Sequence, residues 1–187
     1  MRSALSRWQF GWIINAFSGT PISITSGRAS YNTFGDNTAS VVAAFGKGTG
    51  GALKTENGVV YFPGLQTVPD PSIASITAIN NIRSRSTLQG IADASGKLVL
   101  VNPTAGQLGT LAPGFLEGPG ELRFDINLAK RIQLSERFNV ELRVDAIDAL
   151  NRPQWSDPNV DMNSVNFGRI TAAGGNRIVV LQMRLDF

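Results

Sequence analysis

The chain has 187 residues, of which 42% are apolar and 17% charged, with a formal net charge of +3 and no cysteine or histidine. Disulfide frameworks, zinc–cysteine clusters, thiol nucleophiles and imidazole bases are therefore excluded. The longest uninterrupted apolar run is five residues, at 41–45, whereas a transmembrane helix needs roughly 20. The basic residues are scattered singly, so we expect no nucleic-acid partner, and no motif predicts a cofactor.

The first segment with strand character begins at Trp8. Apolar and polar residues alternate there with the period of a β-strand that has one apolar and one polar surface. After a break at Gly19, Thr20 and Pro21, the sequence predicts that the same strand continues past a bulge, so that it covers about 8–25. The apolar positions are Trp8, Phe10, Trp12, Ile14 and Ala16.

A long connection of about 27–118 follows, rich in Gly, Asn, Ser, Thr and Pro. We expect it to be an irregular loop with one short helix that begins after Asp70 as N-cap, with Pro71 in its first turn and Ile73, Ile76 and Ile79 on one face. The glycines at 46–51 lack the Lys–Ser/Thr pair of a phosphate-binding loop.

Two further strands are predicted at about 121–133 and 138–150, joined by the short turn 134–137. A second connection of about 152–176 leads to the last strand, 178–187, which ends on Phe187. The fold class that this predicts is all-β, an antiparallel meander of about four long strands.

Alternation alone also suits a soluble β-sandwich, but the polar surface carries interleaved opposite charges that fit the hydrated lumen of a transmembrane barrel, where side chains can pair across strands. We therefore predict a segment of such a barrel, with both long connections, 27–118 and 152–176, outside the cell. The predicted lumen-facing charges are Arg123, Asp125, Glu141, Arg143, Asp145, Arg184 and Asp186.

The order of the strands supports a membrane. If the turn 134–137 lies at the inner edge, then Trp8, Phe10, Phe138 and Phe187 lie near that edge too, where an aromatic girdle is expected. Four strands are fewer than the roughly eight of the smallest barrel, so we expect this chain to be part of a larger one in the cell outer membrane.

Both ends of the sequence resemble a known family. "FNVELRVDAIDALNRPQW" followed by "NFGRITAAGGNRIVVLQMRLDF" is similar to the C-terminal end of TonB-dependent outer-membrane receptors, especially the Oar-like branch with a carboxypeptidase-regulatory-like domain. The segment 151–155 matches the Asn-x-Pro-x-aromatic exit of the last upward strand, and "GPGELRFDINLAKRIQL" resembles the preceding region. Asp148 stands where the family has Asn.

The resemblance implies the C-terminal part of a receptor for energised uptake, because the signal sequence, plug domain and TonB box of such receptors are missing. Implied partners are outer-membrane lipid, the missing N-terminal barrel and plug, the energy-transducing inner-membrane complex through that missing part, and the barrel-assembly machinery. The implied assembly signal is a terminal aromatic preceded by alternating apolar residues: Val179, Leu181, Met183, Leu185 and Phe187.

Two alternatives to transport remain open at this level. One is a structural or adhesive outer-membrane protein whose long loop binds a surface partner, and the other is a secreted soluble β-sandwich that acts as a binding module. We expect no enzyme, since carboxylates such as Asp125 and Asp145, which could act as acid and base, fit a charge ladder equally well.

Overall fold

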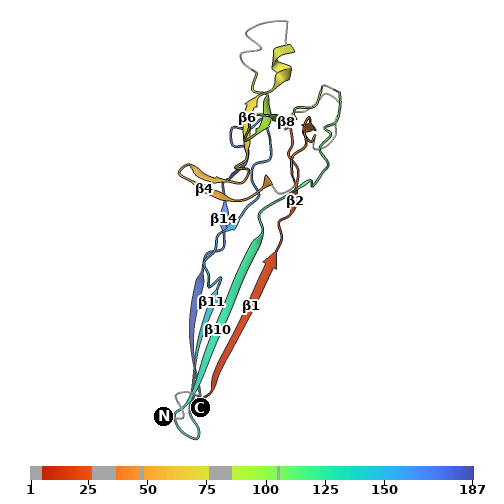
Figure 1. Ribbon diagram of the computed structural model, residues 1–187. Coiled ribbons are helices and arrows are strands. Elements are labelled where there is room, and N and C mark those ends of the chain that lie inside the picture. Colours follow the sequence, from red (N-terminus) through yellow and green to blue (C-terminus); the bar gives the residue numbers. More distant parts are fainter. Residues whose placement is uncertain (1–5, 27–36, 47–48, 76–85, 105) are drawn as a thin grey trace. The chain divides into compact units, whose positions relative to one another are not determined.

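The computed structural model of the chain describes residues 6–26, 37–46, 49–75, 86–104 and 106–187. Contacts divide the chain into two compact units, each described separately below (Figure 1). Unit 1 comprises Met1–Phe17, Gly120–Trp155 and Ala173–Phe187, and unit 2 comprises Ser18–Pro119 and Ser156–Ala172. Within the described residues, no helix has the length and apolar character required to cross a membrane.

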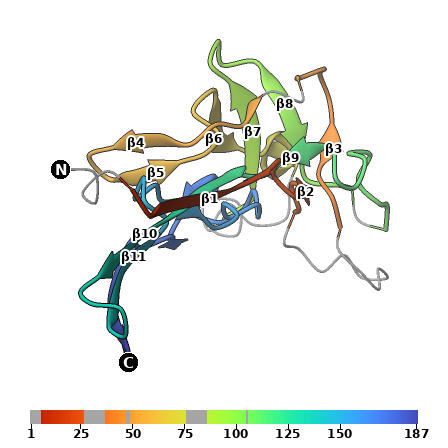
Figure 2. The ribbon, with the colours of Figure 1, turned by 90° about the horizontal axis from the view of Figure 1, so that it is seen from below.

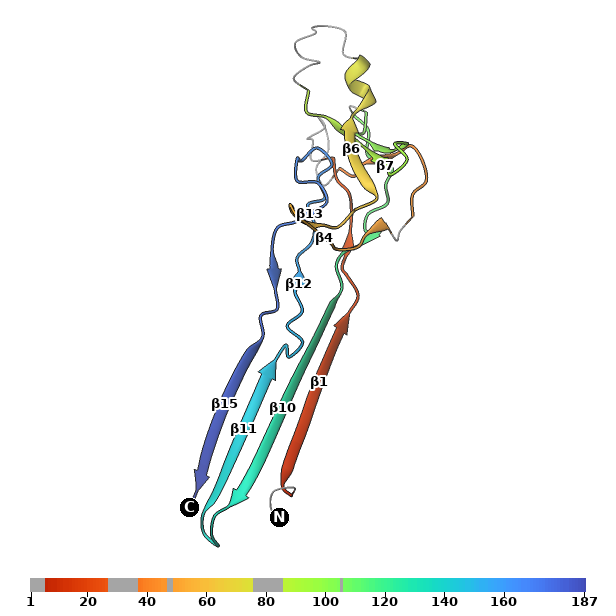
Figure 3. The same cartoon turned by 60° about the vertical axis from the view of Figure 1, so that its left-hand side comes forward.

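Unit 1 is built on a four-stranded antiparallel sheet in the order β1-β10-β11-β15 (Figure 3). The short turn between β10 and β11 is closed by a hydrogen bond from the Leu134 amide to the Phe138 carbonyl, 2.9 Å. The long strands are β1 (Trp8–Phe17), β10 (Glu121–Gln133), β11 (Asn139–Ile147) and β15 (Ile178–Asp186), and the short strands β12 (Gln154–Trp155) and β14 (Ala173–Gly174) pair with each other.

The register keeps each predicted row of side chains on one surface of the sheet. Trp12 pairs with Ile126, Ile126 with Ala146, and Ala146 with Val179, so the apolar rows of all four strands coincide. We call this surface the apolar face. Its residues are Trp8, Phe10, Trp12, Ile14, Ala16, Leu122, Phe124, Ile126, Leu128, Lys130, Ile132, Val140, Leu142, Val144, Ala146, Val179, Leu181, Met183 and Leu185.

The strand expected over 8–25 is shorter in the structure. β1 ends at Phe17, and Pro21 begins the separate strand β2 (Pro21–Ile22), which pairs with β9 (Leu116–Glu117). A Cβ added to Gly19 would lie only 1.7 Å from the Gly118 carbonyl oxygen, so the two backbones cross here at a distance that glycine alone permits.

The strand expected over 138–150 also ends early. β11 stops at Ile147 because Asp148 has a positive φ of 49°, a left-handed conformation that extended strands do not contain. The chain then turns, and the Asn151 amide donates to the Asp148 carbonyl at 2.8 Å.

Unit 2 contains short strands where the sequence predicted an irregular loop. β7 lies between β6 and β8 in one four-stranded sheet, whose order is β3-β8-β7-β6 (Figure 2), and a three-stranded sheet has the order β13-β5-β4. The strands are β3 (Ser40–Val41), β4 (Leu53–Thr55), β5 (Gly58–Val60), β6 (Leu65–Pro69), β7 (Gln89–Asp93), β8 (Leu98–Val101) and β13 (Arg169–Ile170).

The predicted helix is present in part. Pro71–Ser75 form a 3₁₀ helix, η2, and the Asp70 carboxylate accepts a hydrogen bond from the Ser72 amide at 2.8 Å, as an N-cap does. The expected positions Ile76 and Ile79 lie outside the described residues.

The apolar core of the described chain lies in unit 2. In this part of the molecule, every buried apolar side chain belongs to unit 2, and the apolar side chains of the long strands are not among them. The core residues are Ile22, Ile24, Ala39, Tyr61, Phe62, Ile91, Ala92, Val99, Leu100, Leu111, Leu116, Met162 and Ile170.

A buried polar network joins distant segments of unit 2. Asp70 accepts hydrogen bonds from the amide and side chain of Asn102 at 2.9 and 2.8 Å, and Asn163 donates to the Asn102 side chain at 2.7 Å. Burial raises the pKa of Asp70, but the hydrogen bonds from Ser72 and Asn102 outweigh burial and hold that pKa below its usual value. The network therefore favours the ionised carboxylate.

Candidate functional site

The apolar face of unit 1 is open in this chain. Its outermost strand is the most exposed, with Leu181 at 75% and Met183 at 76% of their accessible surface, and the aromatic side chains of β1 are exposed as well. Contiguous apolar surface on this scale is rare on a protein that meets only water, and it marks a surface that contacts lipid or another protein.

The opposite surface, which we call the polar face, carries a repeated ion pair. An arginine Nε lies close to the aspartate two residues later on each of three adjacent strands, and a fourth pair joins Arg131 Nη2 to Glu141 Oε2 across strands at 3.0 Å. The three repeats are Arg123–Asp125 at 3.1 Å, Arg143–Asp145 at 2.9 Å and Arg184–Asp186 at 2.8 Å.

All seven charges predicted to share one surface lie in the polar rows of the register. Pairing across strands was expected from the sequence, but three of the four ion pairs join residues of the same strand. Arg131 was not among the predicted charges. It lies in the same alternating row as Arg123 and Asp125, so the alternation could have identified it. The rows also contain Gln9, Gly11, Ile13, Asn15, Phe17, Glu121, Asn127, Ala129, Gln133, Asn139, Ile147, Ile178, Val180 and Gln182.

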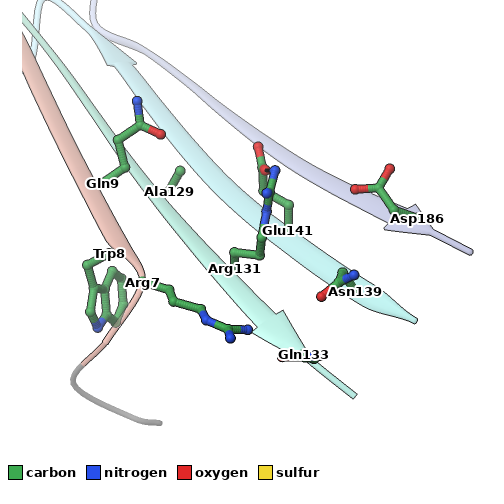
Figure 4. A pocket seen from close by; sticks show the side chains of 9 residues that line it. All are labelled: Arg7, Trp8, Gln9, Ala129, Arg131, Gln133, Asn139, Glu141 and Asp186. Carbon is green, nitrogen blue, oxygen red and sulfur yellow. Dashed lines mark hydrogen bonds and ion pairs between the residues drawn. The ribbon is translucent and has the colours of Figure 1, made fainter. Parts of the chain in front are cut away.

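A polar pocket of 590 Å³ lies on the polar face near the β10–β11 turn (Figure 4). Ala129 is small and leaves space between Gln9 and the Arg131–Glu141 pair, while Arg7 and Asp186 come from opposite edges of the sheet. Opposite charges around an open depression suit polar or zwitterionic contacts rather than an apolar ligand.

A second pocket of 340 Å³ lies farther along the same face. Ile13, Ile147 and Val180 give it an apolar wall beside Asp125 and the Arg143–Asp145 pair. The polar face thus carries both apolar and charged side chains at this end. The alternation within single strands did not predict this.

Lys130 is the exception on the apolar face, since it occupies an apolar row but carries a charge. Its side chain is only 9% exposed, with Nζ 4.8 Å from the centroid of the Trp8 ring and donating a hydrogen bond to the Ser6 carbonyl. A cation–π contact and a carbonyl partner are the usual way to hold such a charge beside apolar surface.

Asp148 lies at the other end of β11 and is only 2% exposed. Its amide donates to the Asp125 carboxylate at 2.8 Å, but within the described chain neither oxygen of its own carboxylate has a hydrogen-bond partner. The buried acid therefore costs stability rather than adding to it.

The residues predicted for the girdle and the assembly signal lie at the open surface. Trp8, Phe138 and Phe187 lie near the β10–β11 turn, and Phe187 is 92% exposed, whereas Phe10 lies one apolar row farther along. Both roles stay predictions.

The described residues contain no group of three or more His, Cys, Asp or Glu side chains placed to hold a metal. Asp125 and Asp145, considered as an acid and base pair, each accept a hydrogen bond from the arginine of their own strand. This arrangement supports a charge ladder.

A family model described as "Outer membrane beta barrel domain" matches residues 1–180. No curated protein and no solved structure matches the chain.

Proposed function

Because the chain belongs to the outer membrane beta barrel domain family, and is therefore an all-β protein of the outer membrane, we propose that it forms the C-terminal barrel strands of a TonB-dependent receptor. In this role it is a non-catalytic part of a transporter for energised uptake. The proposal combines the family with the resemblance of both chain ends to Oar-like receptors.

The observation that carries the barrel assignment is the distribution of buried side chains. Unit 2 buries apolar residues as a water-soluble protein does, whereas the long strands keep theirs on an open face. The bilayer is a solvent in which such a face is stable, because lipid replaces the missing core.

The length of the strands is suited to crossing an outer membrane. The ten residues of β1 extend about 33 Å at 3.3–3.4 Å per residue, and a tilt of about 40° reduces this to roughly 25 Å. That is the height of the apolar band of an outer-membrane barrel.

The polar face would then line the lumen. Its ion pairs neutralise one another along and across strands, and the polar pocket near the β10–β11 turn would contact water or the plug of the parent receptor. The free edges of β1 and β15 would pair with the remaining strands of the parent, since lipid cannot satisfy backbone hydrogen bonds.

An adhesive outer-membrane protein is the second candidate. The observation that favours it is the folded character of unit 2, which has its own core and a buried polar network. A rigid segment of this kind can present a binding surface without transport.

The test of barrel formation is fractionation of the parent protein expressed with its signal sequence. We expect it in the outer membrane, with a band whose migration changes on heating because the barrel unfolds. Recovery with soluble protein and no heat-modifiable band would contradict the barrel.

The coding sequence immediately upstream of Met1 separates the two candidates. A plug domain and TonB box in the same reading frame would support the receptor. An intact gene that encodes neither would instead favour the adhesive protein.

A further inference from the structure

Arg7 is placed beside the sheet of unit 1 by its backbone. It has a left-handed φ of 63°, so β1 begins only at Trp8, and its carbonyl accepts a hydrogen bond from the Arg131 amide at 3.2 Å. This contact continues the register of the two strands by one position, because Trp8 pairs with Lys130. Arg7 and Arg131 are therefore neighbours, and both line the polar pocket.

The Arg7 guanidinium lies at this pocket without a partner. Figure 4 shows the side chain extending from the start of β1 across the end of β10. Within the described residues the guanidinium forms no ion pair and no hydrogen bond, and the residue is exposed. The pocket thus has a cation in its wall whose hydrogen-bond donors are all available.

The two acids of the pocket are already paired. Glu141 Oε2 lies 3.0 Å from Arg131 Nη2, and Asp186 Oδ1 lies 2.8 Å from Arg184 Nε. Among the described charged side chains that line the pocket, Arg7 alone lacks an ion-pair partner. An anion in the pocket would meet this guanidinium and the nitrogen atoms of Arg131 that are not bonded to Glu141.

Three carboxamides complete the wall of the pocket. Gln9, Gln133 and Asn139 line it, and none of their side chains forms a hydrogen bond within the part of the chain that the structure describes. Each has an NH₂ group that can donate to an anion and a carbonyl that can accept from a ligand amide. The small side chain of Ala129 leaves room for a ligand between these groups.

We propose that the polar pocket binds a carboxylate, with Arg7 as the principal donor. A guanidinium binds a carboxylate through two parallel hydrogen bonds, and the carboxamides can hold an amide group beside it. A doubly charged phosphate fits less well, since Glu141 and Asp186 in the same wall repel its second negative charge. The site depends on the folded sheet of unit 1, and on neither transport nor lipid contact.

The carboxylate has two possible sources, a free small acid and an acidic side chain elsewhere in the parent protein. The contact with Arg7 is the same in both cases, but its strength differs. A free acid meets an exposed charge in water, where such contacts are weak, so we expect millimolar affinity. A side chain of the same polypeptide is held at the pocket at a high effective concentration.

The experiment measures how fast phenylglyoxal modifies Arg7 in the whole chain, in a neutral maltoside detergent at constant ionic strength, with peptide mass spectrometry as the readout. The probes are N-acetylglycinate, its neutral analogue N-acetylglycinamide, and inorganic phosphate. We expect about 100 mM N-acetylglycinate to slow the modification by about threefold or more, in keeping with a weak, exposed charge contact. The neutral analogue should have no effect, and phosphate a smaller one.

Arg137 is the internal control, because it is exposed in the β10–β11 turn and does not line the pocket. A general ionic effect would protect it equally. The variant Ala129→Leu fills the pocket without a change of charge, so it should lose the protection of Arg7 while its circular dichroism matches that of the original chain.

Four results would each overturn the proposal. They are no protection of Arg7 by N-acetylglycinate, equal protection of Arg137, equal protection by N-acetylglycinamide or phosphate, and undiminished protection in a folded Ala129→Leu variant.

The same measurement on the membrane-inserted parent identifies the source of the carboxylate. Protection of Arg7 that requires added N-acetylglycinate indicates a free acid. Slow modification without added acid, which Ala129→Leu accelerates, indicates an acidic side chain of the parent.

Discussion

At the scale of single residues, the carboxyl group of Asp148 makes no hydrogen bond within the described chain. Replacing it by asparagine keeps the side-chain size and suits the positive φ, while it removes a buried carboxyl group whose oxygens have no hydrogen-bond partner in the described chain. We expect Asp148→Asn to raise the free energy of unfolding by about 1 kcal/mol, measured by urea titration in detergent micelles.

The matched control for that variant is Asp145→Asn on the same strand. It makes the same chemical change at a carboxylate that is paired with Arg143, so it should leave stability unchanged or lower it. A loss of stability in Asp148→Asn would show that the buried acid has a partner after all.

Asp70 predicts how unit 2 responds to acid. Its pKa in the folded chain is lowered, so its contribution to stability is complete above the unfolded value near 4 and is lost as pH falls through the lower folded value. We expect a lower protection factor for the Asn102 amide, which donates to Asp70, below about pH 4, when its exchange rate is compared with the intrinsic rate at the same pH.

The variant that checks this is Asp70→Asn, in which the group cannot titrate. Its Asn102 amide should exchange faster at neutral pH and lose the acid dependence specific to Asp70. An unchanged acid response in that variant would assign the effect to another group.

For single residues, the sequence could predict which surface of the sheet a charged side chain lies on, but not which residue it pairs with. Alternation identifies which charges share a row because strand geometry fixes the direction of each side chain. It does not identify ion-pair partners, since a long arginine reaches a neighbour on its own strand as readily as one across the ladder, as Arg143 and Arg131 respectively do.

At the scale of elements, substitutions at neighbouring positions of β10 distinguish the apolar face from the polar face by their cost in stability. An arginine in place of Ile126 would lie in the bilayer and should cost about 2–4 kcal/mol, whereas one in place of Asn127 would enter the wet lumen and cost much less. Reversible unfolding from lipid vesicles measures both. Similar costs would argue against a lipid-facing row.

The last strand carries a second prediction at this scale. Deleting Phe187 removes the terminal aromatic of the implied assembly signal but no partner within the sheet ladder, which ends at Asp186. We expect less heat-modifiable parent protein in the outer membrane and unchanged synthesis, compared by immunoblot. If the parent protein without Phe187 is inserted to the full extent, Phe187 is not part of an assembly signal.

Strand existence was easier to predict than strand ends. The alternating rows of 8–17 and 121–133 suffice for β1 and β10, because a regular period reports an extended backbone. The ends depend on positions such as Gly19 and Asp148, whose close backbone approach and positive φ arise only in the folded chain.

At the scale of the whole molecule, the two units treat their apolar side chains differently. Unit 2 buries them in a core, and unit 1 keeps them on an open face. The core of unit 2 was not predicted, because its strands are two to five residues long and their apolar residues come from distant segments rather than from one periodic run. The sheet of unit 1 was predictable because its pattern is local.

The barrel assignment depends on contact between the apolar face and lipid, which electron paramagnetic resonance measures along a single strand. The chain itself has no cysteine, so once any cysteine elsewhere in the membrane-inserted parent is replaced, spin labels can be placed singly along β10 at Leu122, Arg123, Phe124, Asp125, Ile126 and Asn127. We predict that accessibility to oxygen peaks at the even positions and accessibility to a water-soluble nickel chelate at the odd ones. Even positions shielded from both reagents would reveal a packed protein core and contradict the account.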